Sequence, residues 1–314
     1  MTALLLFMLS LSADSDATLL VNTYPGSLYS VLCDGSAEQV SPVEVSDASW
    51  PLVSEHGYAL GRSTDGQREE TVLLDIRSRQ VTRVKIELPS LAHGGGDLTH
   101  DGNLAYLNAA ETAIIVVNIF TGEASVVVET ELAGALSPPA WSSDGSALAC
   151  YIAEPNAVPD DAFRIRVCRK LGDNWDHITI SPPSMLGMRS PGRARAPVWS
   201  PNGECIVFSA RYQESERGHQ LYAVDVDGGN LRRINDEGAS CSISQGCGGM
   251  VTCHKGDSVA LLNVETGEET PLQLPVEARA VKGTTNGQYW AFWMDNAIWV
   301  AAKSGPTNVH KVVN

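Results

Sequence analysis

The stretch PVWSPNGECIVFSA at residues 197–210 has a close counterpart in PAWSSDGSALACYI at residues 139–152. In both, a short apolar segment ending in Trp-Ser precedes a turn that contains Asp or Asn and Gly, and an apolar strand follows. Asn, Asp and Ser stabilise tight corners through hydrogen bonds between side chain and backbone, and Gly adopts the positive φ that such corners need. The same hairpin written twice in one chain indicates an internal repeat.

This turn pattern recurs along the whole chain. A Ser or Thr, then a turn-forming Asp, Asn or Gly, and then a short strand start at Ser12, Ser54, Thr99, Ser142, Ser200, Ser244 and Thr284. The intervals are 42, 45, 43, 58, 44 and 40 residues, so one unit carries additional residues. Periods of this length are typical of propeller blades.

Each unit also contains two further strands. The turn is followed by an apolar strand such as TVLLDIRS (residues 71–78) and then by a more polar strand such as QVTRVKIEL (residues 80–88), which predicts a four-stranded meander. One such sheet cannot cover both of its apolar faces, whereas several arranged around an axis pack face to face. The sequence therefore predicts an all-β fold, a seven-bladed β-propeller of four-stranded antiparallel blades.

The predicted propeller fills a single domain over residues 1–314, with blades that start near residues 3, 48, 95, 138, 196, 241 and 279. In this scheme residues 3–12 form the innermost strand of blade 1 and pair with residues 17–23. The alternative is a six-bladed propeller in which residues 1–45 are a leader and a cap.

The segments APVWSPNGECIVFSARYQ (residues 196–213) and QLYAVDVDGGNLRRIN (residues 220–235) resemble the TolB-type, WD40-like propeller repeat. In that repeat a Trp-Ser-Pro-Asp-Gly turn leads to an Ile-Ala-Phe strand and then to an Asp-Gly-Gly corner. The resemblance implies a propeller fold. Tol-system proteins with this repeat are periplasmic, have six blades and carry a separate α/β domain, for which this chain has no room, so the resemblance does not imply the Tol function.

Charge and cysteine content limit the partners and the compartment. The formal net charge of −15 argues against nucleic acid and anionic membranes as partners, because binding to phosphates needs clustered Lys and Arg. Seven scattered cysteines favour a reducing, cytoplasmic location. A periplasmic or secreted location is the alternative if residues 1–17 are a signal peptide. No apolar run is long enough to predict a membrane span.

We expect no metal site and no cofactor. Cys241, Cys247, Cys253 and His254 lack the spacing of a zinc site, and the repeat predicts that they lie on one inner hairpin. The aspartates of VDVDGG coincide with the ordinary corner of the repeat. We expect the tryptophans near the inner turns, Trp50, Trp141 and Trp199, to pack between blades.

Long loops predict the working face. In a meander, the loops between strands two and three lie on the same face as the links between blades, and both additions to the long unit fall there. They are AEPNAVPDDAF (residues 153–163) and SPPSMLGMRSPGRARA (residues 181–196). The loop at residues 210–220 and the link at residues 88–97 belong to this face as well. Loops on a rigid ring often carry function.

Basic residues gather on these loops within an acidic chain. The candidate ligand- or partner-binding residues are Arg189, Arg193, Arg195, Arg211, Arg217, His219 and His93. Arg suits the recognition of carboxylate or phosphate, which predicts an anionic ligand or an acidic stretch of a partner. Salt bridges to the neighbouring loop acids, Asp160, Asp161, Glu214 and Glu216, are the alternative role.

Two functions fit these features. We favour a monomeric, non-catalytic interaction module that binds a protein or peptide on the loop-rich face of blades 3–5. The alternative is an enzyme that resembles the oligogalacturonate lyases and acts on an anionic saccharide, in which an Arg neutralises the substrate carboxylate and His93 or His219 is the general base. A propeller fragment of a larger assembly also remains open.

Overall fold

The computed structural model covers the 314-residue chain. It describes residues 8–10, 19–23, 27–31, 37–39, 49–53, 58–65, 68–75, 78–84, 96–132, 135–153, 163–172, 174–180, 185–186, 197–200, 202–212, 220–234, 243–245, 250–255, 258–275, 279–283, 289–295, 297–302 and 309–313.

The described strands form consecutive antiparallel sheets, numbered here along the chain. Sheet 1 contains β1 (Met8–Ser10), β2 (Leu19–Thr23), β3 (Ser27–Val31) and β4 (Ala37–Gln39). Sheet 2 contains β5 (Ser49–Val53), β6 (Tyr58–Asp65), β7 (Arg68–Asp75) and β8 (Gln80–Val84). Sheet 3 contains β9 (Gly96–Leu98), β10 (Asn103–Leu107), β11 (Ala113–Asn118) and β12 (Ala124–Glu129).

The remaining sheets follow the same order. Sheet 4 contains β13 (Ala140–Trp141), β14 (Ala147–Ala153), β15 (Phe163–Leu171) and β16 (Asn174–Ile180). Sheet 5 contains β17 (Met185–Leu186), β18 (Val198–Trp199), β19 (Cys205–Tyr212), β20 (Gln220–Asp225) and β21 (Arg232–Arg233). Sheet 6 contains β22 (Ile243–Gln245), β23 (Met250–Lys255), β24 (Ser258–Asn263) and β25 (Glu269–Leu272). Sheet 7 contains β26 (Arg279–Gly283), β27 (Tyr289–Met294), β28 (Ala297–Ala302) and β29 (Val309–Val313).

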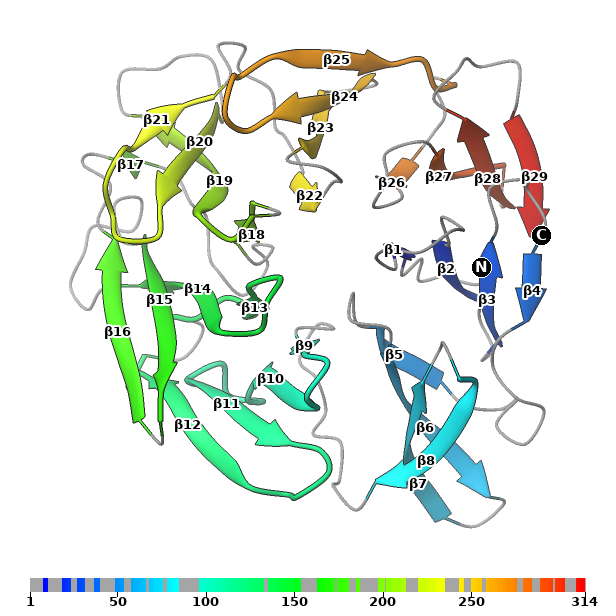
Figure 1. Ribbon diagram of the computed structural model, residues 1–314, viewed down its shortest axis with the longest axis horizontal. Helices are drawn as coiled ribbons and strands as arrows, with labels where there is room; N and C mark the ends of the chain where they lie inside the picture. Colours follow the sequence, from blue (N-terminus) through cyan, green and yellow to red (C-terminus); the bar gives the residue numbers. More distant parts are fainter. Residues whose placement is uncertain are drawn as a thin grey trace.

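Each of these sheets is a meander, and the sheets stand around a central axis. Apart from β17, consecutive strands pair within every sheet. Figure 1 shows one strand of each sheet nearest the centre of the ring, namely β1, β5, β9, β13, β18, β22 and β26. This arrangement is a β-propeller. The predictions of an all-β fold and of four-stranded antiparallel sheets are therefore confirmed. Sheet 5 differs by one strand, because β17 also pairs with β19.

The start of the chain takes part in the ring. Met8–Ser10 pairs with residues 19–21 of β2, and β1 lies next to β26 of sheet 7. Figure 1 shows sheet 1 and sheet 7 as neighbours, with the N- and C-termini at the same side of the ring. Residues 3–7 and 11–12 of the predicted first strand lie outside the described residues.

The Trp-Ser turns have the structural role that their residues predict. In the turn before β14, the backbone N–H of Ala147 donates to Ser142 Oγ (3.0 Å), and Ser142 Oγ donates to Asp144 Oδ1 (2.6 Å). In the turn before β19, Cys205 N–H donates to Ser200 Oγ (3.0 Å), and Ser200 Oγ donates to Asn202 Oδ1 (2.7 Å). Two similar sequences therefore fold into two similar corners.

The tryptophans before these turns connect neighbouring sheets. Trp199 Nε1 donates to the carbonyl of Ala140 in sheet 4 (2.9 Å), and Trp141 Nε1 donates to the carbonyl of Asp97 in sheet 3 (3.2 Å). The prediction that Trp141 and Trp199 pack between blades is confirmed. The side chain of Trp50 lies outside the described residues.

The hydrophobic core lies between the sheets. Leu148 and Cys150 of sheet 4 pack against Ile114 and Val116 of sheet 3, and similar apolar clusters fill the spaces between sheets 2 and 3, 4 and 5, 5 and 6, and 6 and 7. Burial of apolar surface at about 25 cal/mol per Å² makes these interfaces the main source of stability. Within the described ranges, no helix is long and apolar enough to cross a membrane.

Candidate functional site

The predicted loop face falls largely outside the part of the chain that the structure describes. This applies to Arg189, Arg193, Arg195, Arg217, His219 and His93, and to the side chain of Arg211. The backbone of Arg211 is described, because it lies in β19. Cys241 and Cys247 of the inner hairpin also lie outside the described residues, whereas Cys253 pairs with Ile243 between β22 and β23.

One backbone pairing joins two segments of the loop face. In the link between sheets 4 and 5, β17 pairs with the end of β19, so that Met185 lies opposite Tyr212 and Leu186 lies opposite Arg211. This pairing joins residues 185–186 of the link to the end of β19, where the loop at residues 210–220 begins. Arg189 follows Leu186 by three positions in the sequence.

Sheet 4 contains two described arginines in β15, Arg164 and Arg166. Arg164 and Arg166 alternate with Ile165 and Val167 along β15, so they lie on the other face of the sheet, beside Cys168. Burial lowers the pKa of His177 and the positive charge of Arg166 lowers it further, while Asp176 opposes the shift. The alternation of Arg with apolar residues in FRIRVCRK (residues 163–170) is the sequence signal for this position.

The buried thiols of sheet 4 have low reactivity. Cys150 and Cys168 are free cysteines, both fully buried in the core between sheets 3 and 4. Burial raises the pKa of both thiols, that of Cys168 to about 12. Since the thiolate is the reactive form, these residues act as core side chains.

A cavity of about 340 Å³ opens between sheets 5 and 6. Sheet 5 contributes the turn between β18 and β19 and the residues around the corner between β20 and β21, and sheet 6 contributes the corner after β24. In an antiparallel meander these turns lie at the opposite end of the sheets from the long loops. We call this end the turn face and the other end the loop face.

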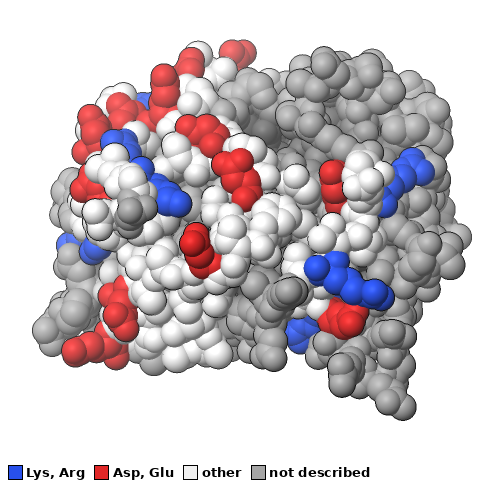
Figure 2. All heavy atoms as spheres, turned by 60° about the horizontal axis from the view of Figure 1, so that its bottom comes forward, with Lys and Arg blue, Asp and Glu red and all other residues white. Residues whose placement is uncertain are grey.

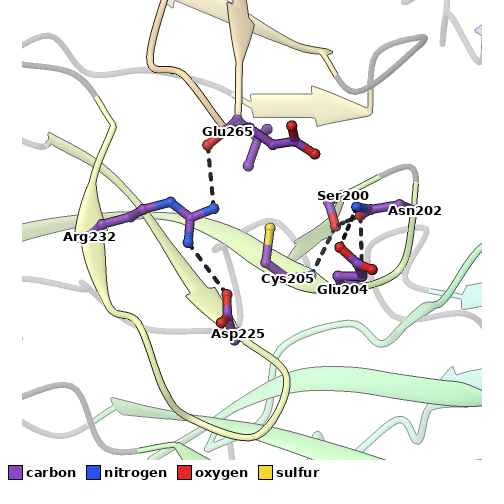
Figure 3. Close-up of a pocket in the computed structure, with 8 residues that line it drawn as sticks. Ser200, Asn202, Glu204, Cys205, Asp225, Arg232 and Glu265 are labelled. Carbon is purple, nitrogen blue, oxygen red and sulfur yellow. Dashed lines mark hydrogen bonds and ion pairs between the residues drawn. The ribbon is translucent and has the colours of Figure 1, made fainter.

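Arg232 forms one wall of the cavity and bridges the two sheets (Figure 3). Its guanidinium lies 3.4 Å from Asp225 Oδ1 and donates to the carbonyl of Val264 in sheet 6 (3.5 Å). The other walls carry Glu204 and Glu265, and Glu204 Oε2 accepts a hydrogen bond from Asn202 Nδ2 (2.8 Å). The cavity therefore contains three carboxylates and one guanidinium.

Sequence reasoning assigned these residues to turns alone and missed the cavity. Asp225, one of the two aspartates at the predicted corner of the repeat, forms an ion pair with Arg232. Among the described residues, no group of three or more His, Cys, Asp or Glu side chains is placed to hold a metal ion. The charged side chains that line the cavity suit recognition by charge.

Figure 2 shows both acidic and basic side chains on the described part of one face of the molecule. Asp and Glu are spread over its described residues, with Lys and Arg side chains in smaller groups between them. This agrees with the net charge of −15. A cationic group that approaches this side of the ring meets a favourable field.

Comparison with known proteins identifies relatives by structure alone. No family model matches the chain, and no curated protein matches it in sequence. The crystal structure of the tricorn protease matches 97% of this chain with a TM-score of 0.62 and 10% identity. The oligogalacturonate lyase from Vibrio parahaemolyticus matches the whole chain with a TM-score of 0.61 and 12% identity. A TolB protein from Agrobacterium tumefaciens matches 73% of the chain and 82% of its own length, with a TM-score of 0.45 and 18% identity.

The similarities to the tricorn protease and to the lyase support the β-propeller fold. The chain spans 34% of the length of the tricorn protease and 85% of that of the lyase. At such low sequence identity, these matches show the fold but do not assign an activity. The match to TolB has a TM-score below 0.5, so it does not support the TolB-type resemblance.

Proposed function

We propose that this chain is a monomeric, non-catalytic interaction module that binds a protein or peptide with an acidic stretch on the loop face of sheets 3–5. The observation that carries the proposal is the pairing of β17 with β19, with Leu186 opposite Arg211. It attaches the link that contains Arg189, Arg193 and Arg195 to the strand that leads into the loop containing Arg217. This attachment supports the proposal that arginines of the two loops act on the same partner.

The chemistry of these residues suits an acidic partner. Arg presents a planar group that makes paired hydrogen bonds to a carboxylate, and it stays charged at every physiological pH. The global charge of −15 repels acidic molecules elsewhere on the surface. A local basic surface on an acidic protein therefore selects both the partner and its orientation.

We also propose that the ring has seven blades, each corresponding to one of the sheets described above, and that the TolB-type repeat of residues 196–235 is one of them. The pairing of β1 with β2 and the proximity of β1 to β26 support a blade at the start of the chain. A rigid, closed ring gives the loops a fixed base, which lowers the entropy cost of binding.

The test is a partner screen with the wild-type chain and the triple variant R189A/R193A/R195A as baits. A control variant, R79A/R83A/R233A, removes three exposed arginines from other surfaces. We expect the triple variant to lose partners that the wild type and the control variant retain. Equal recovery by all three chains would refute the proposed site.

The lyase alternative is tested with the wild-type chain and with variants in which His93 or His219 is replaced. Wild-type protein is incubated with oligogalacturonate, and the ultraviolet absorbance of an unsaturated product is followed. We expect no turnover. Turnover that disappears when His93 or His219 is replaced, with affinity retained, would identify the chain as an enzyme and would overturn the interaction proposal.

A further inference from the structure

Two carboxylates of the cavity between sheets 5 and 6 form no ion pair with a described Lys or Arg. Arg232 is engaged by Asp225 and by the carbonyl of Val264. Glu204 of sheet 5 and Glu265 of sheet 6 line the same space, and neither forms an ion pair with a Lys or Arg among the described residues. Two carboxylates from different sheets therefore line one cavity, in which the guanidinium of Arg232 is paired with Asp225.

A buried thiol opens into the same hollow. Cys205 is 5% exposed and free, and its sulfur points into the space between Arg232 and the Ser200 turn (Figure 3). A thiol is a weak hydrogen-bond donor and acceptor, and Cys205 Sγ has no hydrogen-bond partner among the described residues. Together with Val264, which is 1% exposed, it gives the hollow a weakly polar floor beneath acidic walls.

This combination selects a long side chain with a charged end. A volume of about 340 Å³ is near the lower end of ligand sites, which span roughly 300–1,000 Å³. It accommodates a long side chain but no folded element. Lys and Arg bury an apolar stem while the charged head seeks carboxylates, so their two halves match the floor and the walls of the cavity.

We propose that this cavity binds a Lys or Arg side chain from a basic peptide segment of a partner protein. The apolar stem lies over Cys205 and Val264, and the cationic head lies between Glu204 and Glu265. This site is on the turn face and takes a basic partner, so it is independent of the acidic partner proposed for the loop face. One ring would then join two partners of opposite charge.

Cys205 provides a direct probe of the cavity. Two methanethiosulfonate reagents of similar size are compared, one with a trimethylammonium end and one with a sulfonate end. The thiolate of Cys205 attacks the reagent, a disulfide forms and methanesulfinate leaves, and the labelled Cys205 peptide is quantified by mass spectrometry under native conditions. We expect the cationic reagent to label Cys205 about tenfold faster than the anionic reagent, because the walls attract one and repel the other.

Matched variants separate the cavity from the global charge. In E204Q/E265Q the ratio of the two rates should fall toward one. In the control E123Q/E129Q, which removes two exposed carboxylates from sheet 3, it should remain near the wild-type value. A lysine-containing pentapeptide should slow the labelling of Cys205 in the wild-type chain, whereas the same peptide with Glu or norleucine in place of Lys should leave the rate unchanged.

Several results would overturn the proposal. Equal labelling rates for both reagents, or no labelling of Cys205 at all, would be two such results. A charge preference that persists in E204Q/E265Q would be another. So would protection by the norleucine peptide as strong as that by the lysine peptide. Protection by free diaminobutane but by no lysine peptide would identify a site for small amines and would likewise overturn a peptide partner.

Discussion

Two glycines at the same position in two similar turns provide a test of how neighbouring sheets pack. Gly122 ends the turn NIFTGE at residues 118–123 and Gly267 ends the turn NVETGE at residues 263–268. Their φ angles are +78° and +73°. A Cβ added at Gly122 would meet nothing within 4 Å, whereas one at Gly267 would lie 3.2 Å from the carbonyl oxygen of Ile234 in sheet 5.

The two alanine substitutions should therefore differ in cost. Both G122A and G267A force an L-residue into the left-handed region, which costs about 1–2 kcal/mol. The reduced entropy of the unfolded chain is common to both variants, so it cancels in the comparison. G267A additionally pushes a methyl group against backbone of the neighbouring sheet, and overpacking of this kind costs about 1–3 kcal/mol more. We expect a loss of about 1–2 kcal/mol for G122A and about 2–5 kcal/mol for G267A.

Urea unfolding followed by tryptophan fluorescence measures the difference. The midpoint should fall further for G267A than for G122A, with the slope of the transition unchanged. Equal losses for the two variants, or a larger loss for G122A, would refute the contact between the sheet 6 turn and sheet 5.

Three further predictions concern the sheets themselves. Replacing Trp199, which is 2% exposed, by Phe should cost about 2–3 kcal/mol in urea unfolding, because its hydrogen bond to the neighbouring inner strand and part of its ring are lost; an unchanged midpoint would contradict this. The hydroxyl of Ser142 and the backbone N–H of Ser146 hold the pKa of Asp144 below its ordinary value of 3.8. The wild type should therefore lose stability relative to D144N as the pH falls below 3.8, and melting curves across a pH series measure this difference. Parallel curves for the two proteins would contradict the prediction. Burial should keep Cys150 and Cys168 unlabelled by a neutral thiol reagent in the native protein, and labelling at the rate of the unfolded chain would be the contrary result.

The sequence predicted those parts of the fold that depend on local chemistry. The Ser-Asp-Gly and Ser-Asn-Gly corners follow from hydrogen bonds between residues five positions apart or fewer, as Ser142 and Ser200 show. The tryptophans beside these corners are large and recur with the repeat, so their place between sheets could also be predicted. The meander in turn indicated which loops share a face.

Features that depend on how two sheets meet could not be predicted in this way. At the cavity, Arg232 of sheet 5 reaches the carbonyl of Val264 in sheet 6, and no spacing in the sequence encodes that contact. Glu204 and Glu265 look like ordinary turn residues until both sheets are in place. The addition of β17 to sheet 5 could not be predicted either, because a strand of two residues gives no periodic signal.

The most direct test of the account is the affinity of a recovered acidic partner for the wild-type chain and for R189A/R193A/R195A across a salt series. The account predicts that the variant binds at least about tenfold more weakly, because a charge-assisted hydrogen bond contributes about 1.5–3 kcal/mol. It also predicts that wild-type affinity falls with salt more steeply than that of the variant, and that the melting temperatures stay close, since exposed ion pairs contribute about 0–1 kcal/mol. Equal affinities with equal salt dependence would contradict the claim that these arginines form the binding surface.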